Sequence, residues 1–224
     1  MNTINRNKKY KEYGKDYTAF KEELNMIKND EFRRFIIDCL KNVPSYFYEV
    51  PASSSGKYHP AQDLGEGGTV RHTKTCVGIG LDLLRTNQVV LDNECNEDYN
   101  NDIVIGALLL HDSFKNGLEN SNHTVADHAN YAAALVTKMY EYQTNNKYIE
   151  KYLKYFEHIK PNKYNFNHAY IVQLGDCILA HAGQWNCDYD GNVILPVPTN
   201  SLEVLVHLAD YIASRKYIDY GFEI

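Results

Sequence analysis

Apolar residues recur every three or four positions along most of the chain, a spacing that predicts helices. No segment alternates apolar and polar residues regularly enough to form a central strand. We therefore predict an all-α fold, built as a helical bundle. The predicted helices span Asp16 to Ile27, Asp30 to Asn42, Thr69 to Thr86, Asp102 to Asp112, Thr124 to Tyr142, Lys147 to Ile159, Asn167 or His168 to His181, and a last helix from Ser201 that contains Asp210.

Residues that favour turns and helix ends separate these elements. Residues 44–68 are rich in Pro, Ser and Gly and predict a long loop, a kind of segment that often carries function. The division expected from this is an N-terminal helical extension (1–43) and a catalytic core (44–224). The predicted end signals are N-caps at Thr69, Asp102 and Ser201, a capping box of Thr124 with Asp127, and a C-cap at Gly183.

Length and composition indicate a globular protein with a substantial core. The chain has 224 residues, 44% of them hydrophobic, and no apolar stretch approaches the roughly 20 residues of a membrane span. Residues 1–11 are polar and basic with no apolar segment behind them, which argues against a secretory signal and favours the cytoplasm. The net charge of −6 argues against a broad nucleic-acid-binding face, which is normally basic.

Five cysteines are dispersed through the chain without a CxxC pair. An odd, scattered set is typical of reduced thiols in the cytoplasm and not of a disulfide framework. We interpret all five as small core residues with no part in metal binding: Cys39, Cys76, Cys95, Cys177 and Cys187.

The apolar run after Asp102 ends in the dipeptide His111-Asp112. A helix this apolar should be buried on all sides, and a buried carboxylate is costly unless it is paired or bound to a metal. Histidine nitrogen and aspartate oxygen are both good ligands for divalent cations. The dipeptide therefore predicts a metal site, provided that other helices supply further ligands.

Other predicted helices do carry such residues. Apart from the adjacent pair, each candidate lies on its own helix, and inward-pointing residues from facing helices are how a bundle builds a metal site. The predicted ligand set is His72, His111, Asp112, His128, His181 and Asp210.

Four stretches carrying this set resemble, in the same order, the HD-domain superfamily of metal-dependent phosphohydrolases. They lie within residues 50–216, most of the chain, and are Gly67–Thr73 (GGTVRHT), Ala107–Lys115 (ALLLHDSFK), Ile178–Gly183 (ILAHAG) and Leu208–Ala213 (LADYIA). The resemblance implies an HD-type helical bundle. It also implies that His72, His111, Asp112 and Asp210 hold one metal, and that His128 and His181 are the additional histidines of two-metal members.

In such members the aspartate of the HD pair bridges the two ions, and Asp112 takes that position here. The residues that follow the pair read Ser113-Phe114-Lys115, where the family usually has Ile-Gly-Lys. The lysine is retained, and we expect it to meet a substrate phosphate. Phe114 replaces the small glycine, and we expect it to narrow the pocket.

The chemistry implied by the resemblance is attack of a metal-activated hydroxide on phosphorus. Asp112 and Lys115 are the predicted catalytic residues. One or two divalent ions are expected; mixed His and carboxylate ligation favours Mn or Fe, with Co, Zn and Mg as alternatives. The predicted substrate-binding residues are Lys115, Arg71, Arg215 and His59, and the loop aromatics Trp185 and Tyr189 are candidates for stacking on a base.

The expected substrate is a nucleotide or another small phosphate ester, since the chain is acidic and forms a single compact unit. A phosphodiesterase or exonuclease acting on short single-stranded nucleic acid is the nearest alternative. A di-iron oxygenase on the same fold is an alternative of another reaction class, and a regulatory module that binds metal without turnover is a third. The sequence leaves open whether the chain forms a homo-oligomer.

Overall fold

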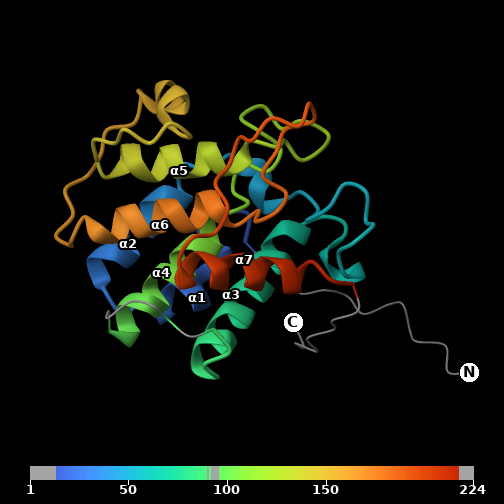
Figure 1. Ribbon diagram of the computed structural model, residues 1–224, viewed down its shortest axis with the longest axis horizontal. Coiled ribbons are helices and arrows are strands. Elements are labelled where there is room, and N and C mark those ends of the chain that lie inside the picture. Colours follow the sequence, from blue (N-terminus) through green and yellow to red (C-terminus); the bar gives the residue numbers. More distant parts are fainter. Residues whose placement is uncertain (1–13, 90, 92–95, 217–224) are drawn as a thin grey trace, which may run out of the picture.

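The computed structural model describes residues 14–89, 91 and 96–216, and over these residues the protein is a bundle of helices (Figure 1). The only β-pairing among them is an isolated bridge between Cys187 and Val193. The all-α prediction is therefore confirmed. The helices are α1 (Lys21–Met26), α2 (Asp30–Leu40), α3 (Gly68–Arg85), α4 (Glu97–Leu110), α5 (His128–Met139), α6 (Ala169–Ala180) and α7 (Ser201–Ala213), with 3₁₀ turns η1 (Tyr17–Phe20), η2 (Ser45–Tyr48), η3 (Ala61–Asp63) and η4 (Glu150–Phe156).

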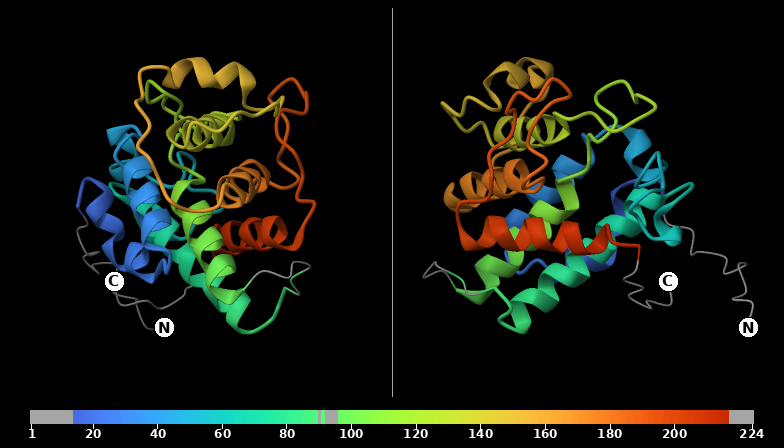
Figure 2. Two further views of the ribbon diagram at one scale, coloured as in Figure 1. Left: turned by 90° about the vertical axis from the view of Figure 1, so that its left-hand side faces the viewer. Right: turned by 45° about the vertical axis from the view of Figure 1, so that its right-hand side comes forward.

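Helix α4 forms the centre of the bundle. It packs against α1, α2, α3, α6 and α7, and every residue from Asp102 to Leu110 is buried (Figure 2). Each fully buried Leu, Ile or Val contributes about 1.5–3 kcal/mol relative to exposure, so the apolar run of α4 is a main source of the bundle's stability. The helix ends at Leu110. The His-Asp pair thus follows directly on the most buried segment.

Asp102 does not cap α4, in contrast to the prediction. The helix begins five residues earlier, at Glu97, and Asn96 caps it by accepting the Tyr99 N–H. The Asp102 carboxylate instead accepts the backbone N–H groups of Lys28 and Asn29, at 2.7 and 2.9 Å. It therefore ties the connection between α1 and α2 to the central helix.

Three other helices, α3, α5 and α7, also do not begin with the predicted N-cap residue. Thr69 lies inside the first turn of α3, where Gly67 is the N-cap, and its hydroxyl donates to the Val50 carbonyl. Asn200 caps α7, so Ser201 is the first helical residue. Helix α5 begins only at His128, and Asp127 makes no capping bond but accepts from the Tyr152 hydroxyl.

The segment from residue 44 to 67 is a loop, as predicted, but an ordered one. It contains η2 and η3, and the Ala52 N–H donates to the Asp63 carbonyl. Gly68 is required where this loop meets α3, because a Cβ there would overlap the backbone carbonyl of Asp63. The loop is thereby held against the first turns of α3.

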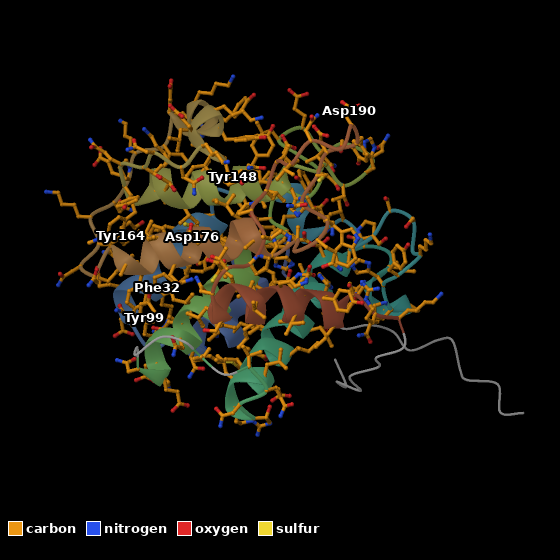
Figure 3. The ribbon with its side chains drawn as sticks, in the orientation of Figure 1. Phe32, Tyr99, Tyr148, Tyr164, Asp176 and Asp190 are labelled. Atoms are coloured by element: carbon orange, nitrogen blue, oxygen red, sulfur yellow. The ribbon has the colours of Figure 1, made fainter. Side chains whose placement is uncertain are left out.

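A cluster of aromatic side chains joins α2 to the segment before α6. Phe32 packs edge-on against Phe166 with ring centroids 5.5 Å apart, and Phe35 packs against Tyr164 at 5.0 Å. Figure 3 shows Phe32, Tyr99 and Tyr164 gathered at one end of the molecule, far from Asp190. The first two helices thus belong to the same core as the later ones.

The predicted exposed helix at Lys147–Ile159 is a 3₁₀ segment, η4, whose Tyr152 and Phe156 are buried. Within the described residues, no helix is both long enough and apolar enough to cross a membrane. The predicted absence of a secretory signal at residues 1–11 concerns a segment outside the described residues, as does Cys95.

Candidate metal centre

The predicted ligands converge at one end of the bundle, from five helices. His72 lies in the second turn of α3, His111 directly follows α4, His128 begins α5, His181 directly follows α6, and Asp210 lies in the last turn of α7. The loops that precede α3, α5 and α7 lie on this same side (Figure 1). The helix ends thus bring together residues separated by up to 138 positions.

Four side chains form what we call the first half-site: His72, Cys76, His111 and Asp210. Their ligand atoms all lie within 4.8 Å of one another. His72 Nε2 is 3.0 Å from Asp210 Oδ1 and 3.4 Å from Cys76 Sγ, and His111 Nε2 is 3.6 Å from the same Asp210 oxygen. Two nitrogens, one oxygen and one sulfur therefore face a common point.

Three side chains form the second half-site: Asp112, His128 and His181. Their ligand atoms also lie within 4.8 Å of one another. His128 Nε2 is 3.1 Å from His181 Nε2 and 3.4 Å from Asp112 Oδ1. All three side chains are buried.

The hydrogen bonds of Nδ1 determine the tautomers of three of these histidines. Nδ1 of His111, His128 and His181 lies 2.7–2.8 Å from the backbone carbonyl of Leu108, Val125 and Ile178, respectively. A carbonyl only accepts, so each Nδ1 carries the hydrogen and each Nε2 of a neutral ring presents a lone pair. Such bonds also fix the orientation of a metal-ligating ring.

Two lone pairs facing each other at 3.1 Å, as in His128 and His181, repel unless a cation lies between or beside them. Burial lowers the pKa of His128, and burial together with the charge of His111 lowers the pKa of His181 to about 3. A proton is therefore not the cation that holds this pair together at neutral pH. In the first half-site, Nε2 of the fully buried His111 has no hydrogen-bond partner. Both features fit a bound metal.

Asp112 lies between the two half-sites. Its Oδ1 faces His128, and its Oδ2 is 3.8 Å from His111 Nε2 and 4.0 Å from His72 Nε2. The same Oδ2 accepts a 2.8 Å hydrogen bond from the Lys115 ammonium. One carboxylate oxygen thus points to each half-site, which is the placement of a bridging ligand.

The two carboxylates are held in the charged form. Burial would raise their pKa values, but Lys115 and His111 keep the pKa of Asp112 well below its usual range. His111 and His72 do the same for the pKa of Asp210. Both aspartates are therefore available as ligands at neutral pH.

The histidines of the first half-site are protonated at neutral pH, whereas those of the second half-site are neutral. Burial opposes protonation, yet Asp112 and Asp210 raise the pKa of His111 to about 10. Cys76 and Asp210 likewise hold the pKa of His72 well above its usual range, against the effect of burial. Without metal, His72 and His111 thus compensate the charge of the carboxylates.

Asp63 is a residue of this centre that the sequence analysis missed. It is fully buried in η3, and its Oδ2 is 3.7 Å from His72 Nδ1, a distance too long for a hydrogen bond but short enough for electrostatic attraction. Neither of its carboxylate oxygens has a hydrogen-bond partner. Asp63 therefore takes, for His72, the place that backbone carbonyls take for the other three histidines.

Cys76 is the second residue that the analysis missed. It is buried, as predicted for a core cysteine, but its sulfur lies among the ligand atoms of the first half-site, where the sequence analysis expected no cysteine. Its position four residues after His72, on the same helix face, was the available indication. Cys39 and Cys177 are buried as predicted, whereas Cys187 is exposed and is not a core residue.

Lys115 and His59 both lie at this centre. The buried Lys115 ammonium donates to Asp112 and to the Ala52 carbonyl of the loop, which occupies two of its three N–H donors. The His59 ring packs edge-on against His72 at 5.0 Å. Burial and the charge of His72 lower the pKa of His59 to about 3, so this ring is neutral at pH 7.

Arg71 does not take the position predicted for a substrate contact. Its side chain is buried, and its guanidinium donates to the backbone carbonyls of Gln62 and Leu64. Arg71 therefore anchors the loop to α3. Phe114 is also placed differently from the prediction, because its ring packs in the core against Tyr131 and Phe156. It does not narrow the site directly.

Arg215 belongs to an aromatic group at the end of α7. Its guanidinium lies 4.0 Å from the centre of the Tyr211 ring and 5.8 Å from that of Trp185. Trp185 stacks on Tyr211 and is 56% exposed. Tyr189, 81% exposed, donates its hydroxyl to the Thr124 carbonyl.

A contact between α6 and α7 joins the two half-sites. The His207 ring, one turn before Asp210, donates from Nδ1 to the His181 carbonyl at 2.8 Å. Gly183 adopts a left-handed conformation (φ +57°), and a Cβ there would overlap the His207 ring. The predicted C-cap, Gly183, thus lies two residues after the observed C-cap, His181.

Comparison of the chain with known protein families, with curated proteins and with solved structures finds no match. The function must therefore be inferred from the residues of the site. Those residues fit a divalent metal centre: six predicted ligands and one additional thiol form two largely buried groups, with Asp112 between them.

Proposed function

We propose that this protein is a metal-dependent phosphohydrolase of the HD type, acting on a nucleotide or another small phosphate ester. The observation that carries the proposal is the placement of Asp112, with one oxygen toward each of two histidine-containing half-sites. When bound there, a pair of divalent cations supplies Lewis acidity and lowers the pKa of a coordinated water. Mn and Fe are the metals that the mixed His and carboxylate set favours, with Co, Zn and Mg as alternatives.

Lys115 is the residue best placed to stabilise charge on the substrate. Its ammonium is buried beside Asp112, where low dielectric strengthens its attraction for a phosphate oxygen. Its contact with the Ala52 carbonyl fixes its position relative to the loop. Lys115 thus orients the substrate and offsets negative charge that develops on the phosphoryl group.

The exposed side chain of Trp185 supports a substrate that carries a base. Trp185 stacks on Tyr211, and the Arg215 guanidinium lies over that pair, a combination that suits base stacking. The acidic chain favours a single nucleotide over a long nucleic acid. His59 and Arg215 are the remaining proposed substrate contacts.

The experiment that tests this function combines elemental analysis with a phosphate-release screen over nucleotides and small phosphate esters in added Mn²⁺. About two metals per chain, with turnover of one substrate class, is the expected result. Two irons with oxygen uptake and no phosphate release would replace the proposal by the di-iron oxygenase. Release of mononucleotides from short single strands alone would replace it by the exonuclease, and a folded protein that binds no metal would contradict every one of these functions.

A further inference from the structure

The thiol of Cys76 has no role in the function proposed above, yet it is fully buried at the ligand cluster. Its Sγ lies 3.4 Å from His72 Nε2, closer than a packing contact between a methyl group and a ring would require. Cys76 follows His72 by one helical turn, so both side chains project from the same face of α3. The helix itself therefore aims the sulfur at the point that the His72 nitrogen faces.

Three of the six separations between ligand atoms of the first half-site are close to the edges of a metal tetrahedron. Metal–nitrogen bonds of about 2.0–2.1 Å and a metal–sulfur bond of about 2.3 Å place neighbouring ligand atoms roughly 3.3–3.6 Å apart. The observed separations are 3.4 Å from His72 Nε2 to the sulfur, 3.0 Å from His72 Nε2 to Asp210 Oδ1, and 3.6 Å from His111 Nε2 to the same oxygen. All four atoms lie within 4.8 Å of one another, so they can converge on one ion.

A second, independent observation points to a ligand at this position. His111 is completely buried, its Nδ1 is engaged by the Leu108 carbonyl, and its Nε2 faces the first half-site without a hydrogen-bond partner. A buried polar atom without a partner costs about 1–3 kcal/mol, and native proteins seldom tolerate it. An ion between His111, His72 and Cys76 satisfies it.

We propose that Cys76 is a thiolate ligand of the first half-site and makes the centre chemically asymmetric. The first half-site then offers two nitrogens, one oxygen and one soft sulfur, and binds Zn²⁺ in preference to Mn²⁺ or Mg²⁺. The second half-site offers only nitrogen and oxygen and accepts harder ions. On coordination the thiol proton leaves to solvent, and no redox change is involved. This inference rests on the metal centre proposed above and is independent of the reaction catalysed.

Cobalt substitution tests the assignment in the whole protein. A thiolate bound to Co²⁺ gives a near-ultraviolet charge-transfer absorption that nitrogen and oxygen ligands do not give. We expect this absorption in the wild type and in Cys39→Ser, a matched control at a buried cysteine of α2, and its loss in Cys76→Ser. Zn²⁺ affinity, measured by chelator competition, should fall about 10–100-fold in Cys76→Ser, with Mn²⁺ affinity changed less than about threefold.

A measurement on the wild type alone covers the case in which Cys76→Ser does not fold, as judged by circular dichroism. Cadmium-113 NMR should show two resonances, one shifted strongly downfield by the sulfur and one in the range of nitrogen and oxygen ligands. Cobalt or cadmium bound without either sulfur signature would overturn the role of Cys76 and leave the metal centre standing. A folded wild type that binds neither ion would overturn both.

Discussion

The two half-sites share histidine and aspartate side chains but differ in the Cys76 sulfur and in charge. In the first, His72 and His111 have raised pKa values and carry protons beside Asp210 at neutral pH. In the second, His128 and His181 have lowered pKa values and are neutral. The second half-site is therefore ready for a metal, whereas the first must lose protons before it can bind one.

This difference follows from the position of Cys76 and of the carboxylates. Asp210 lies 3.0 Å from His72, and it is also the nearer carboxylate to His111, whereas the second half-site has only one oxygen of Asp112 for two imidazoles. Buried histidines ionise only where a carboxylate compensates them. The number of acidic oxygens that each half-site receives thus decides which protons the metals must displace.

Replacing Asp112 with Ala should have the largest effect, because this residue serves both half-sites. Metal content should fall from about two per chain to near zero, and phosphate release should fall by about 1000-fold or more. The buried Lys115 ammonium would also lose its partner, which costs about 3–5 kcal/mol of folding free energy. Elemental analysis and chemical denaturation measure these changes. Full metal content in Asp112→Ala would show that the ligand assignment is wrong.

Replacing His181 with Ala should separate the half-sites. The second loses one of its two nitrogens, while the residues of the first are untouched. We expect about one metal per chain and a loss of phosphate release of about 100-fold. His168→Ala, an exposed histidine one residue before α6, is the matched control and should keep two metals. Loss of both ions in His181→Ala would mean that the half-sites do not bind independently.

The pH dependence of metal binding should distinguish the half-sites in the wild type. Metal entering the first half-site displaces protons from His72 and His111 in addition to the thiol proton of Cys76, so its affinity should rise at least about 100-fold per pH unit between pH 6.5 and 8. Affinity at the second half-site should hardly change over this range, because His128 and His181 are already neutral. Titration calorimetry in buffers of different ionisation enthalpy counts the protons released. Equal proton release at both steps would contradict the assigned protonation states.

Replacing Lys115 with Met should lower turnover and retain both metals. The apolar stem still fills the buried space, but the charge that faces the phosphoryl group is lost. We expect a decrease of about 10–100-fold in phosphate release, with unchanged metal content by elemental analysis. Loss of metal in this variant would mean that Lys115 serves mainly to hold Asp112 in place.

Replacing Asp63 with Asn should have the smallest effect and should act on one half-site. The attraction between Asp63 and His72 Nδ1 would weaken, which should reduce metal affinity at the first half-site by about 10-fold. The second half-site should keep its affinity. Asn162→Ala, which removes a hydrogen bond at the surface far along the chain, serves as control. An equal loss at both half-sites would indicate a general disturbance of the loop.

The six predicted ligands could be chosen from the sequence because each lies within or at the end of an apolar helical segment, and helical periodicity places such segments in the core. Asp63 lies in a loop without any period, so nothing in the pattern distinguished it from a solvated carboxylate. Cys76 was overlooked because a buried cysteine has the same pattern whether it fills space or binds an ion. The sequence pattern predicted that Cys76 is buried, but it did not show that its sulfur lies beside His72.

Helix ends were predicted less well for a related reason. Asp102 is the type of residue that caps a helix, and it does accept two backbone N–H groups, but they belong to a connection more than 70 residues earlier. Local rules identify a side chain that can satisfy orphaned donors and do not say which donors these are. Phe114 is a similar case, since its ring turns away from the site into the aromatic core.

The contact between Gly183 and His207 has a consequence for how the centre tolerates thermal motion. His207 bonds to the His181 carbonyl and occupies the space that a side chain at position 183 would need, so the ends of α6 and α7 move as one body. One of these ends carries a ligand of the second half-site and the other a ligand of the first. The distance between the two half-sites is thus set by the contact of His207 with the His181 carbonyl and Gly183, which includes none of the ligand atoms.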